Sequence, residues 1–528
     1  MRRTVSRRCL ALALAGMMFL AACGGDDSSE SSAPGTESEG GSEGGGEERA
    51  PGSAGELVIA TSETATMDPA KLQTESSGEW DRAAGIYDTL LRWTADGGVA
   101  PQLAESMESP DGQVWTITLR PDVTFTDGTP LDAEAVIFNI ERQRDPTNAC
   151  GCAGNLAEVE SMRAVDPLTV EITLARPNGS FDQGFTGING MIASPTAIQA
   201  DPEGFGSNPV GAGPYVLEEW VRDDHVTLRR NPDYWDPTKP AYETVEMRFM
   251  VDPLARAEAV TAGEVDVAYS AGPAMLIQLG DVESLGYRVE RTGGASFILM
   301  NHSRGPTQDI RVREAISLAF DPERVNSAVL GGLWESQELT CPPFNEEDPE
   351  CSPGLWPSYD ADRARALIEE YAAEGNSTEL TLIGNQGIQG ELEFIQQTLN
   401  DIGLDVTLSP LPGAEWLPAV NAGEFDISWY AIAEPIKARM FYLFRSDQRN
   451  LPKAQIDAYD EAVYTARTSI DSEESLDAWQ QTQEVITDEF MVAWYAPFID
   501  GYVVRDDIDY GDQVRSVRMQ LSELAPAE

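Results

Sequence analysis

Residues 380–408 read LTLIGNQGIQGELEFIQQTLNDIGLDVTL. The apolar run 380–383 predicts a buried strand, and alternating apolar residues predict a second strand over 404–408. The helix expected between them has one apolar face, formed by Leu392, Ile395, Leu399 and Ile402, and ends at Gly403. Strand–helix–strand units of this length place their strands parallel in one sheet, with a right-handed crossover. The stretch therefore predicts an α/β fold.

A second unit of the same kind is expected earlier in the chain. Apolar periodicity predicts a strand over 245–249, a helix over 253–262 and a strand over 265–269. The hexapeptide AGEVDV at 262–267 recurs as AGEFDI at 422–427, each time with Gly where a helix would end. Such a Gly cap before a strand is common local structure. Its repetition in two similar units nevertheless indicates two comparable lobes.

The carboxyl ends of these strands predict a ligand site. In open parallel sheets, ligands bind outside the carboxyl ends of the strands. The expected ends are at 61–63, 269–270, 384–386 and 429–430. Two sheets that face each other with these ends would form one cleft between two lobes.

Shorter patterns predict further elements. Residues 57–60 form a buried apolar run, and apolar residues alternate over 115–120 and 170–174, as in half-exposed strands. Asp132 stands where it can cap a helix over 133–140.

The composition excludes several classes of function. The chain has 528 residues, with 36 Lys and Arg, 89 Asp and Glu, and a formal charge of −53. It has only four Lys, none of them after a Gly-rich loop, so neither nucleic-acid binding nor P-loop chemistry is expected. Two His, at positions 225 and 302, leave little material for a His-based active site or a metal site. We expect a binding protein without cofactor or metal, not an enzyme.

The N-terminal residues predict export and anchoring. Four Arg precede an apolar run over 10–22 that is shorter than the roughly 20 residues of a membrane span, so residues 1–22 are interpreted as a signal peptide. Leu20-Ala21-Ala22-Cys23 resembles a lipobox, which implies a diacylglyceryl group on Cys23 and anchoring to the outer face of the cell membrane. Residues 24–55 are rich in Gly, Ser and acids and lack aromatic residues, so a disordered tether is expected. Residues 6–10 also partly resemble a twin-arginine signal, which leaves the export route open.

Four cysteines remain after the signal peptide and Cys23. They are Cys150, Cys152, Cys341 and Cys351, and they allow three pairings. We expect the short-range pairing, Cys341 with Cys351 and Cys150 with Cys152. The His or further Cys that a metal site would need is missing nearby.

Several motifs, in this order and spacing, resemble the peptide/nickel class (family 5) of extracytoplasmic solute-binding proteins that serve ABC importers. They are YDTLL at 87–91, PQLAES at 101–106, WTITLR at 115–120, VTFTDGTP at 123–130, VGAGPY at 210–215, LRRNPDYW at 228–235 and DIRVREAI at 309–316. Matching residues span nearly all of 57–505.

The resemblance implies a two-lobe periplasmic-binding-protein-like fold of the class II, cluster C type. Lobe I would comprise residues 56–290 and 488–528, with an extra subdomain over about 72–195, and lobe II residues 291–487. Closure of the lobes about two crossovers would deliver a peptide-like or other small organic solute to ABC permease subunits. A monomer is expected. The alternatives are a sensor or chaperone of the same fold without a transport role, or a secreted hydrolase.

The resemblance also suggests ligand-binding residues. In peptide-binding relatives, a Trp of lobe II is followed three residues later by an Asp that pairs with the peptide amino group. Trp429 fits this pattern, but Ile432 takes the Asp position and Glu434 follows, which argues against an ordinary free-amine peptide. The predicted lining residues are Trp80, Asn301, Trp416, Trp429 and Glu434. For the three Trp, core packing is the alternative.

Overall fold

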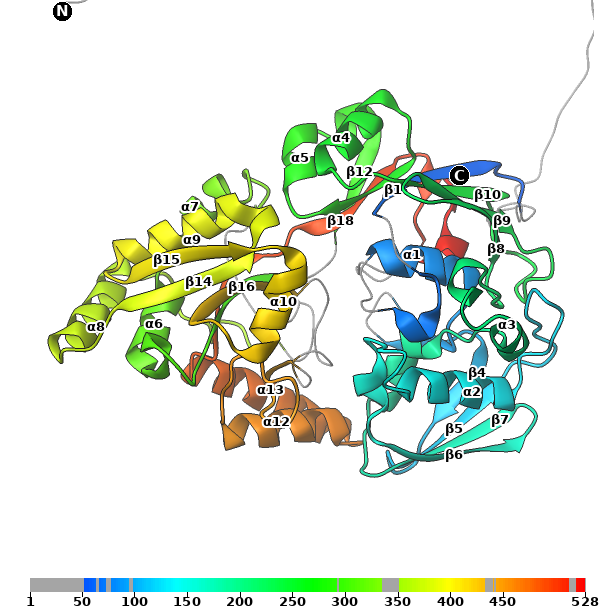
Figure 1. Ribbon diagram of the computed structural model, residues 1–528, viewed down its shortest axis with the longest axis horizontal. Coiled ribbons are helices and arrows are strands. Elements are labelled where there is room, and N and C mark those ends of the chain that lie inside the picture. The colour runs from blue at the N-terminus through cyan, green and yellow to red at the C-terminus, as the bar shows by residue number, and fades with distance from the viewer. Residues whose placement is uncertain are drawn as a thin grey trace, which may run out of the picture. The chain divides into compact units, whose positions relative to one another are not determined.

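Two large sheets organise the chain, and the polypeptide passes between them twice (Figure 1). The computed structural model describes residues 52–62, 66–72, 77–94, 98–291, 294–334, 351–432, 440, 443–511 and 519–527. No helix in these ranges is long and apolar enough to cross a membrane. Glu434, Cys341, Cys23, the expected signal peptide and the expected tether up to residue 51 lie outside the described residues. Residues 52–55, predicted to be the end of a disordered tether, belong to the folded part instead: the amides of Gly52 and Ala54 donate to the carbonyls of Pro240 and Ala241 at 3.0 and 3.1 Å.

The first large sheet is mixed and has seven strands. Its order is β12 (Tyr287–Arg291), β18 (Asp500–Arg505), β11 (Val267–Ala271), β1 (Glu56–Thr61), β10 (Thr244–Phe249), β9 (His225–Arg230) and β8 (Tyr215–Val221). β1 pairs in parallel with both β10 and β11. The expected strand–helix–strand unit is therefore present as β10, α4 (Pro253–Ala262) and β11, although β11 begins two residues later than predicted.

The second large sheet has five strands, in the order β15 (Asp405–Leu411), β14 (Glu379–Asn385), β16 (Ile427–Ile432), β13 (Ala295–Met300) and β17 (Val492–Pro497). β14 pairs in parallel with β15 and β16, and α9 (Gln389–Asp401) joins β14 to β15. The four residues predicted to form the apolar face of this helix are all buried in the core. The parallel strand–helix–strand arrangement predicted for 380–408 is confirmed.

A smaller four-stranded antiparallel sheet has the order β4 (Ala104–Glu108), β5 (Val114–Leu119), β7 (Thr169–Leu174) and β6 (Val159–Asp166). α2 (Ala133–Arg144) packs against it and runs four residues beyond its predicted end. Asp132 accepts a hydrogen bond from the Ala135 amide at 2.9 Å, which is the predicted N-cap. Cys150 and Cys152, in the segment between α2 and β6, form a disulfide, and Cys351 is also disulfide-bonded.

The remaining elements cover the sheets or form short pairs. The helices are α1 (Ser77–Ile86), α3 (Pro195–Ala200), α5 (Ala274–Leu279), α6 (Ile310–Leu318), α7 (Pro322–Ala328), α8 (Ala361–Ala373), α10 (Gly413–Ala422), α12 (Asp457–Thr468) and α13 (Ser472–Asp488). The short strand pairs are β2 (Leu91–Trp93) with β3 (Val99–Pro101) and β19 (Ile508–Asp509) with β20 (Ala525–Pro526).

The repeated hexapeptide has the same structure in both large sheets. Gly263 and Gly423 each end a helix with positive φ, at 68° and 75°. Three residues later, the Asp266 carboxylate accepts a 2.8 Å hydrogen bond from the amide of Val58, and the Asp426 carboxylate accepts one of the same length from Thr381. Each Asp therefore ties the start of its own strand to a neighbouring parallel strand, and the echo is a structural repeat.

Motifs that carry the family resemblance meet around the buried side chain of Asp88. Its Oδ2 accepts hydrogen bonds from the Tyr234 hydroxyl and the Trp235 Nε1, both at 2.7 Å. Its Oδ1 accepts from the Thr89 amide at 3.2 Å and from the Gln102 side-chain amide. The carboxylate thus links three of the motifs and accepts hydrogen bonds from four donors in an apolar setting.

The two crossovers leave each large sheet at the same side, where the parallel strands have their carboxyl ends. The chain passes from β12 to β13 and returns from β17 to β18. Ala271 at the carboxyl end of β11 pairs with Asp500, where β18 begins. Ile432 at the carboxyl end of β16 pairs with Ala295, where β13 begins. The strand ends that were predicted to bind ligand are therefore at the side of each sheet from which the chain crosses to the other sheet.

Candidate ligand-binding site

An acidic and aromatic cluster lies on the five-stranded sheet. Trp429 on β16 and Tyr495 on β17 stand on the two strands that flank β13, and Glu391 approaches both from the first turn of α9. The Trp429 Nε1 donates to Glu391 Oε1 at 3.1 Å, and the Tyr495 hydroxyl donates to the same oxygen. Burial raises the pKa of Glu391, and these two hydrogen bonds partly offset that effect.

Trp416 extends the aromatic surface. It lies on α10, and its Nε1 donates to the Ser428 hydroxyl at 3.1 Å. Its ring centroid is 6.0 Å from that of Trp429 and 5.7 Å from that of Tyr430. Trp416 and Trp429 both stay partly exposed. The structure brings these two predicted residues together, and they offer the kind of aromatic wall with few polar groups that suits a small organic ligand.

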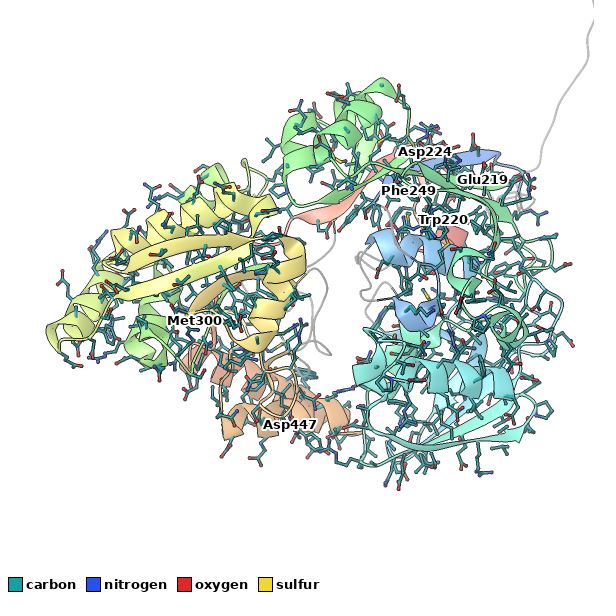
Figure 2. The ribbon with its side chains drawn as sticks, viewed as in Figure 1. Glu219, Trp220, Asp224, Phe249, Met300 and Asp447 are labelled. Atoms are coloured by element: carbon teal, nitrogen blue, oxygen red, sulfur yellow. A yellow bond between two sulfur atoms is a disulfide. The ribbon has the colours of Figure 1, made fainter. Side chains whose placement is uncertain are left out.

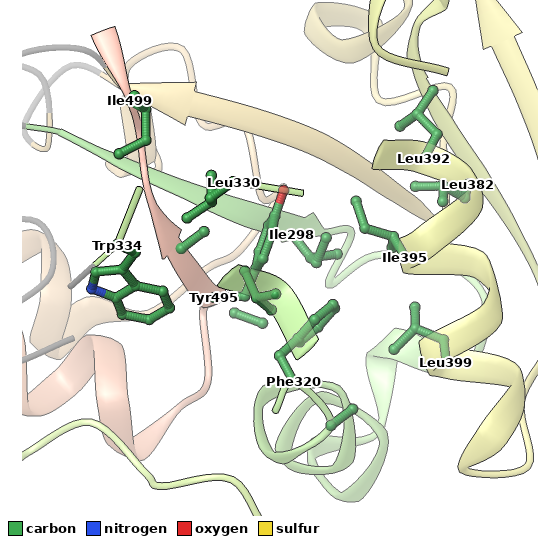
Figure 3. Packing of buried hydrophobic residues seen from close by; sticks show 14 of the residues in the cluster. Ile298, Phe320, Leu330, Trp334, Leu382, Leu392, Ile395, Leu399, Tyr495 and Ile499 are labelled. Atoms are coloured by element: carbon green, nitrogen blue, oxygen red, sulfur yellow. The ribbon is translucent and has the colours of Figure 1, made fainter. Parts of the chain in front are cut away.

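Apolar packing holds Tyr495 in place. Its ring stacks at a tilt against Phe320, with 4.8 Å between the centroids. Figure 3 shows the ring between Leu330 and Ile298, with the hydroxyl pointing away from Phe320. Because the ring is fixed by the core, the hydroxyl that reaches Glu391 has a defined position.

Buried polar side chains lie near the start of β18, where the chain enters the seven-stranded sheet from the second crossover. The Asp81 carboxylate accepts from the Tyr502 hydroxyl at 3.0 Å, and Asp500 accepts from the Tyr269 hydroxyl at 2.9 Å. Burial raises the pKa of Asp81 well above its usual range, although Tyr502 and the adjacent Arg82 lower it. Arg82 donates to the Ser62 carbonyl and lies 5.2 Å from the ring centroid of Phe249, which is labelled in Figure 2.

Two predicted lining residues occupy the core instead. Trp80 is 1% exposed, and its Nε1 donates to the Met519 carbonyl at 3.3 Å. Asn301 is fully buried, and its side-chain amide donates to the carbonyls of Gly423 and Phe425. Neither side chain has surface to offer a ligand, so the structure differs from the sequence prediction at both positions.

The residue at the Asp position of peptide-binding relatives is also part of the core. Ile432 is 2% exposed and packs on the opposite face of the sheet from the Glu391 cluster. No group of His, Cys, Asp or Glu among the described residues could hold a metal ion. His225 opens β9 and pairs with Asp224 at 2.8 Å, and this contact raises the pKa of His225.

One hollow of about 580 Å³ lies elsewhere, on α12 and α13. Its lining is mostly polar and acidic, with Asp471, Glu473, Glu474 and Asp477, and includes no aromatic residue. It shares no residue with the aromatic cluster. An open acidic depression without apolar walls is a poor site for an organic ligand.

Two sheets joined by two crossovers, with an aromatic cluster on one of them, define a two-lobe binding protein. Residues 98–447 match the family described as bacterial extracellular solute-binding proteins, family 5, middle region. The match covers more than half of the chain, so the chain belongs to this family of ABC-importer solute-binding proteins.

Similar proteins bind different solutes. The chain is 28% identical over 425 residues to a glutathione-binding protein, GsiB, of Salmonella paratyphi A, covering 77% of this chain and 82% of GsiB. Among solved structures, NikA of Brucella suis in complex with Fe(III)-EDTA has a TM-score of 0.77 at 23% identity, covering 89% of this chain and 99% of NikA. DppA of Helicobacter pylori in complex with the peptide STSA has a TM-score of 0.74 at 22% identity, covering 91% and 99%. These likenesses support the two-lobe fold and leave the solute open.

Sequence reasoning missed Glu391 and Tyr495. Glu391 stands in the first turn of a helix, where acids are common because they interact favourably with the helix dipole. The available signal was its position shortly after the carboxyl end of β14, at a strand end already predicted to face a ligand.

Proposed function

We propose that this chain is an extracytoplasmic solute-binding lipoprotein that delivers a peptide-like or other small organic solute to an ABC permease. The observation that carries the proposal is the partly exposed Trp416–Trp429 pair on a sheet that is joined to its counterpart by only two crossovers. Paired crossovers of this kind are suited to hinge closure around a ligand. In this proposal, residues 56–290 and 488–528 form lobe I, with a subdomain over about 72–195, and residues 291–487 form lobe II.

A contact far from the crossovers supports closure. The Gly179 amide donates to the Thr468 carbonyl at 3.2 Å, and the Ser180 hydroxyl donates to the Arg467 carbonyl at 3.3 Å. The Arg176 guanidinium lies 5.4 Å from the ring centroid of Tyr464. Residues 176–180 belong to the proposed subdomain and residues 464–468 to proposed lobe II, so these bonds would form when the lobes meet.

The similarity to GsiB supports a peptide-like solute, because glutathione is a tripeptide derivative. That proposal is tested with a thermal-shift screen of the chain lacking residues 1–23. The panel holds di- to pentapeptides, glutathione, opines, oligosaccharides, polyamines and nickel chelates. A true ligand raises the melting temperature with its concentration, by mass action. A panel without any shift would contradict solute binding.

Trp429→Ala is expected to abolish the shift given by the best ligand of that screen. The substitution removes the ring that faces Trp416 and the Nε1 donor to Glu391. Because Trp429 is partly exposed but also packs against the core and donates to Glu391, we expect a small drop in the melting temperature without ligand, and the ligand-induced shift is measured from the variant's own melting temperature without ligand. An unaltered ligand response would remove Trp429 from the site.

Cys23→Ser is expected to move the protein from the membrane fraction to the soluble extracytoplasmic fraction. The proposed anchor is a diacylglyceryl group on the Cys23 thiol, and two acyl chains hold a protein far more firmly than one. The measurement is fractionation with mass spectrometry of the N-terminal peptide. Cys9→Ser, within the expected signal peptide, is the matched control and should leave the protein at the membrane.

A further inference from the structure

Glu391 is held by two aromatic donors through only one of its oxygens. Both Trp429 and Tyr495 donate to Oε1. Within the described part of the chain, no donor bonds to Oε2 and no Lys or Arg forms an ion pair with Glu391. Oε2 is not one of the fully enclosed unpaired polar atoms of the described residues, and the side chain is half-buried. One carboxylate oxygen therefore stays unbonded at a partly accessible position.

The surroundings of Glu391 penalise a charge that has no partner. Its helix neighbour Leu392, together with Ile298 and Tyr495, belongs to the core cluster beneath it. A carboxylate in such apolar surroundings is costly unless a cation or further donors compensate. The N-terminal turn of α9 offers only a modest favourable field. A ligand cation at Oε2 would supply the missing compensation.

Asp81 and Asp500, the buried acids near the start of β18 in the seven-stranded sheet, differ from Glu391 because each has a positively charged neighbour. Asp81 lies beside Arg82, whose charge lowers the Asp81 pKa. Burial lowers the pKa of the Arg256 guanidinium, and the opposite charge of nearby Asp500 partly counters that effect. Those carboxylates have cationic neighbours within the protein. Glu391 is thus a half-buried acid of the aromatic cluster whose charge is not balanced by a described Lys or Arg.

We propose that Glu391, Trp429 and Tyr495 form a subsite for an ammonium or guanidinium group of the solute. The cation would pair with Oε2 in a charge-assisted hydrogen bond while Trp429 and Tyr495 hold Oε1. The ring faces of Trp416 and Trp429 would add cation–π attraction. This inference rests on the proposed function and narrows its solute to molecules that carry an ammonium or guanidinium group.

The test compares probes that differ in one positive charge. They are Nα-acetyl-L-arginine with Nα-acetyl-L-citrulline, triglycine with N-acetyltriglycine, and glutathione with N-acetylglutathione, titrated calorimetrically into the chain lacking residues 1–23. In each pair only the first compound, called the cationic member, carries an ammonium or guanidinium group. We expect the cationic member of at least one pair to bind at least tenfold more tightly. Glu391→Gln should weaken binding of that member by about 10- to 100-fold and leave the neutral member unchanged, since Gln keeps the Oε1 acceptor and removes the charge.

Glu393→Gln is the matched control, because Glu393 lies on the same helix, is exposed, and bonds only to Gln389 among the described residues. It should leave both affinities unchanged. Equal binding of both members of every pair to the unaltered protein would overturn the inference while the proposed function stands, whether or not the variant folds. A loss of both members on Glu391→Gln would assign Glu391 a structural role and also overturn it. If no probe of either charge binds and the wider screen is also negative, the proposed function fails with it.

Discussion

Asp88→Ala is expected to lower the free energy of unfolding by about 3–5 kcal/mol, because it leaves several buried hydrogen-bond donors without an acceptor. The substitution leaves donors on Thr89, Gln102, Tyr234 and Trp235 without their acceptor in a buried setting. A buried donor without an acceptor costs about 1–3 kcal/mol. The expected loss of stability is therefore reached even if some of the four donors find another acceptor. The measurement is urea unfolding at pH 7.

The control for this loss is Glu105→Ala. Glu105 is an exposed carboxylate on β4, in the same part of the chain. Exposed substitutions of this kind change stability by about 0.5 kcal/mol or less. A loss below about 1 kcal/mol for Asp88→Ala, within the range of a single ordinary hydrogen bond, would show that the four donors find other partners.

The same variant has a defined pH dependence. Burial raises the pKa of Asp88 to about 6, despite the hydrogen bonds from Trp235 and Tyr234. An unfolded Asp titrates near 3.9, so between about pH 4 and 6 the folded protein keeps a proton that the unfolded chain releases. Stability contributed by this proton is fully present below about pH 4 and is lost as the pH rises through about 6. The deficit of Asp88→Ala relative to the unaltered protein should therefore shrink as the pH rises from 4 to 7. A deficit that grows over this range would mean that the donors hold the pKa of Asp88 low.

Local sequence patterns predicted the elements of the two large sheets well. The apolar face of α9 follows from helical periodicity, because residues on one face meet the core wherever the helix packs. The hexapeptide echo likewise predicted equivalent turns, since a Gly with positive φ ends both helices. Its Asp residues gained their role only from pairing with β1 and β14, which are distant in sequence.

The candidate site was harder to predict because burial depth is decided by distant segments. Trp80 and Trp429 look alike in sequence, yet Trp80 is enclosed partly by Met519 near the other end of the chain, while Trp429 stays partly exposed. Glu391 meets Trp429 across 38 residues and Tyr495 across 104. No local sequence pattern predicts contacts between residues so far apart in the chain. It requires the order of β16, β13 and β17 in the sheet.

Gly179→Ala is expected to raise the dissociation constant of the best ligand about tenfold, with little change in the melting temperature without ligand. A Cβ at Gly179 would lie 2.3 Å from the Ser469 carbonyl oxygen and 3.0 Å from its carbon. Backbone atoms cannot yield cheaply at such distances, so the segments around Gly179 and Thr468 would have to separate. That separation breaks two hydrogen bonds, each worth about 0.5–1.5 kcal/mol, and about 1.4 kcal/mol corresponds to tenfold in affinity.

Gly179→Ala should weaken ligand binding more than it lowers stability, because the contact between residues 179–180 and 467–468 lies outside the cores of the sheets. Gly179 and Ser180 precede a short 3₁₀ helix (Phe181–Thr186), and their partners Thr468 and Arg467 end α12, so neither bond belongs to the core of a sheet. If these bonds form on closure, their loss disfavours the closed state that the ligand selects, and affinity falls by the corresponding factor. Gly184→Ala is the matched control within that 3₁₀ helix, since the nearest atom to its Cβ would be 3.6 Å away, an ordinary contact. Equal affinities for the Gly179 variant and the unaltered protein would show that the liganded state does not use this contact, and closure would then have to be stabilised by the ligand and the crossovers alone.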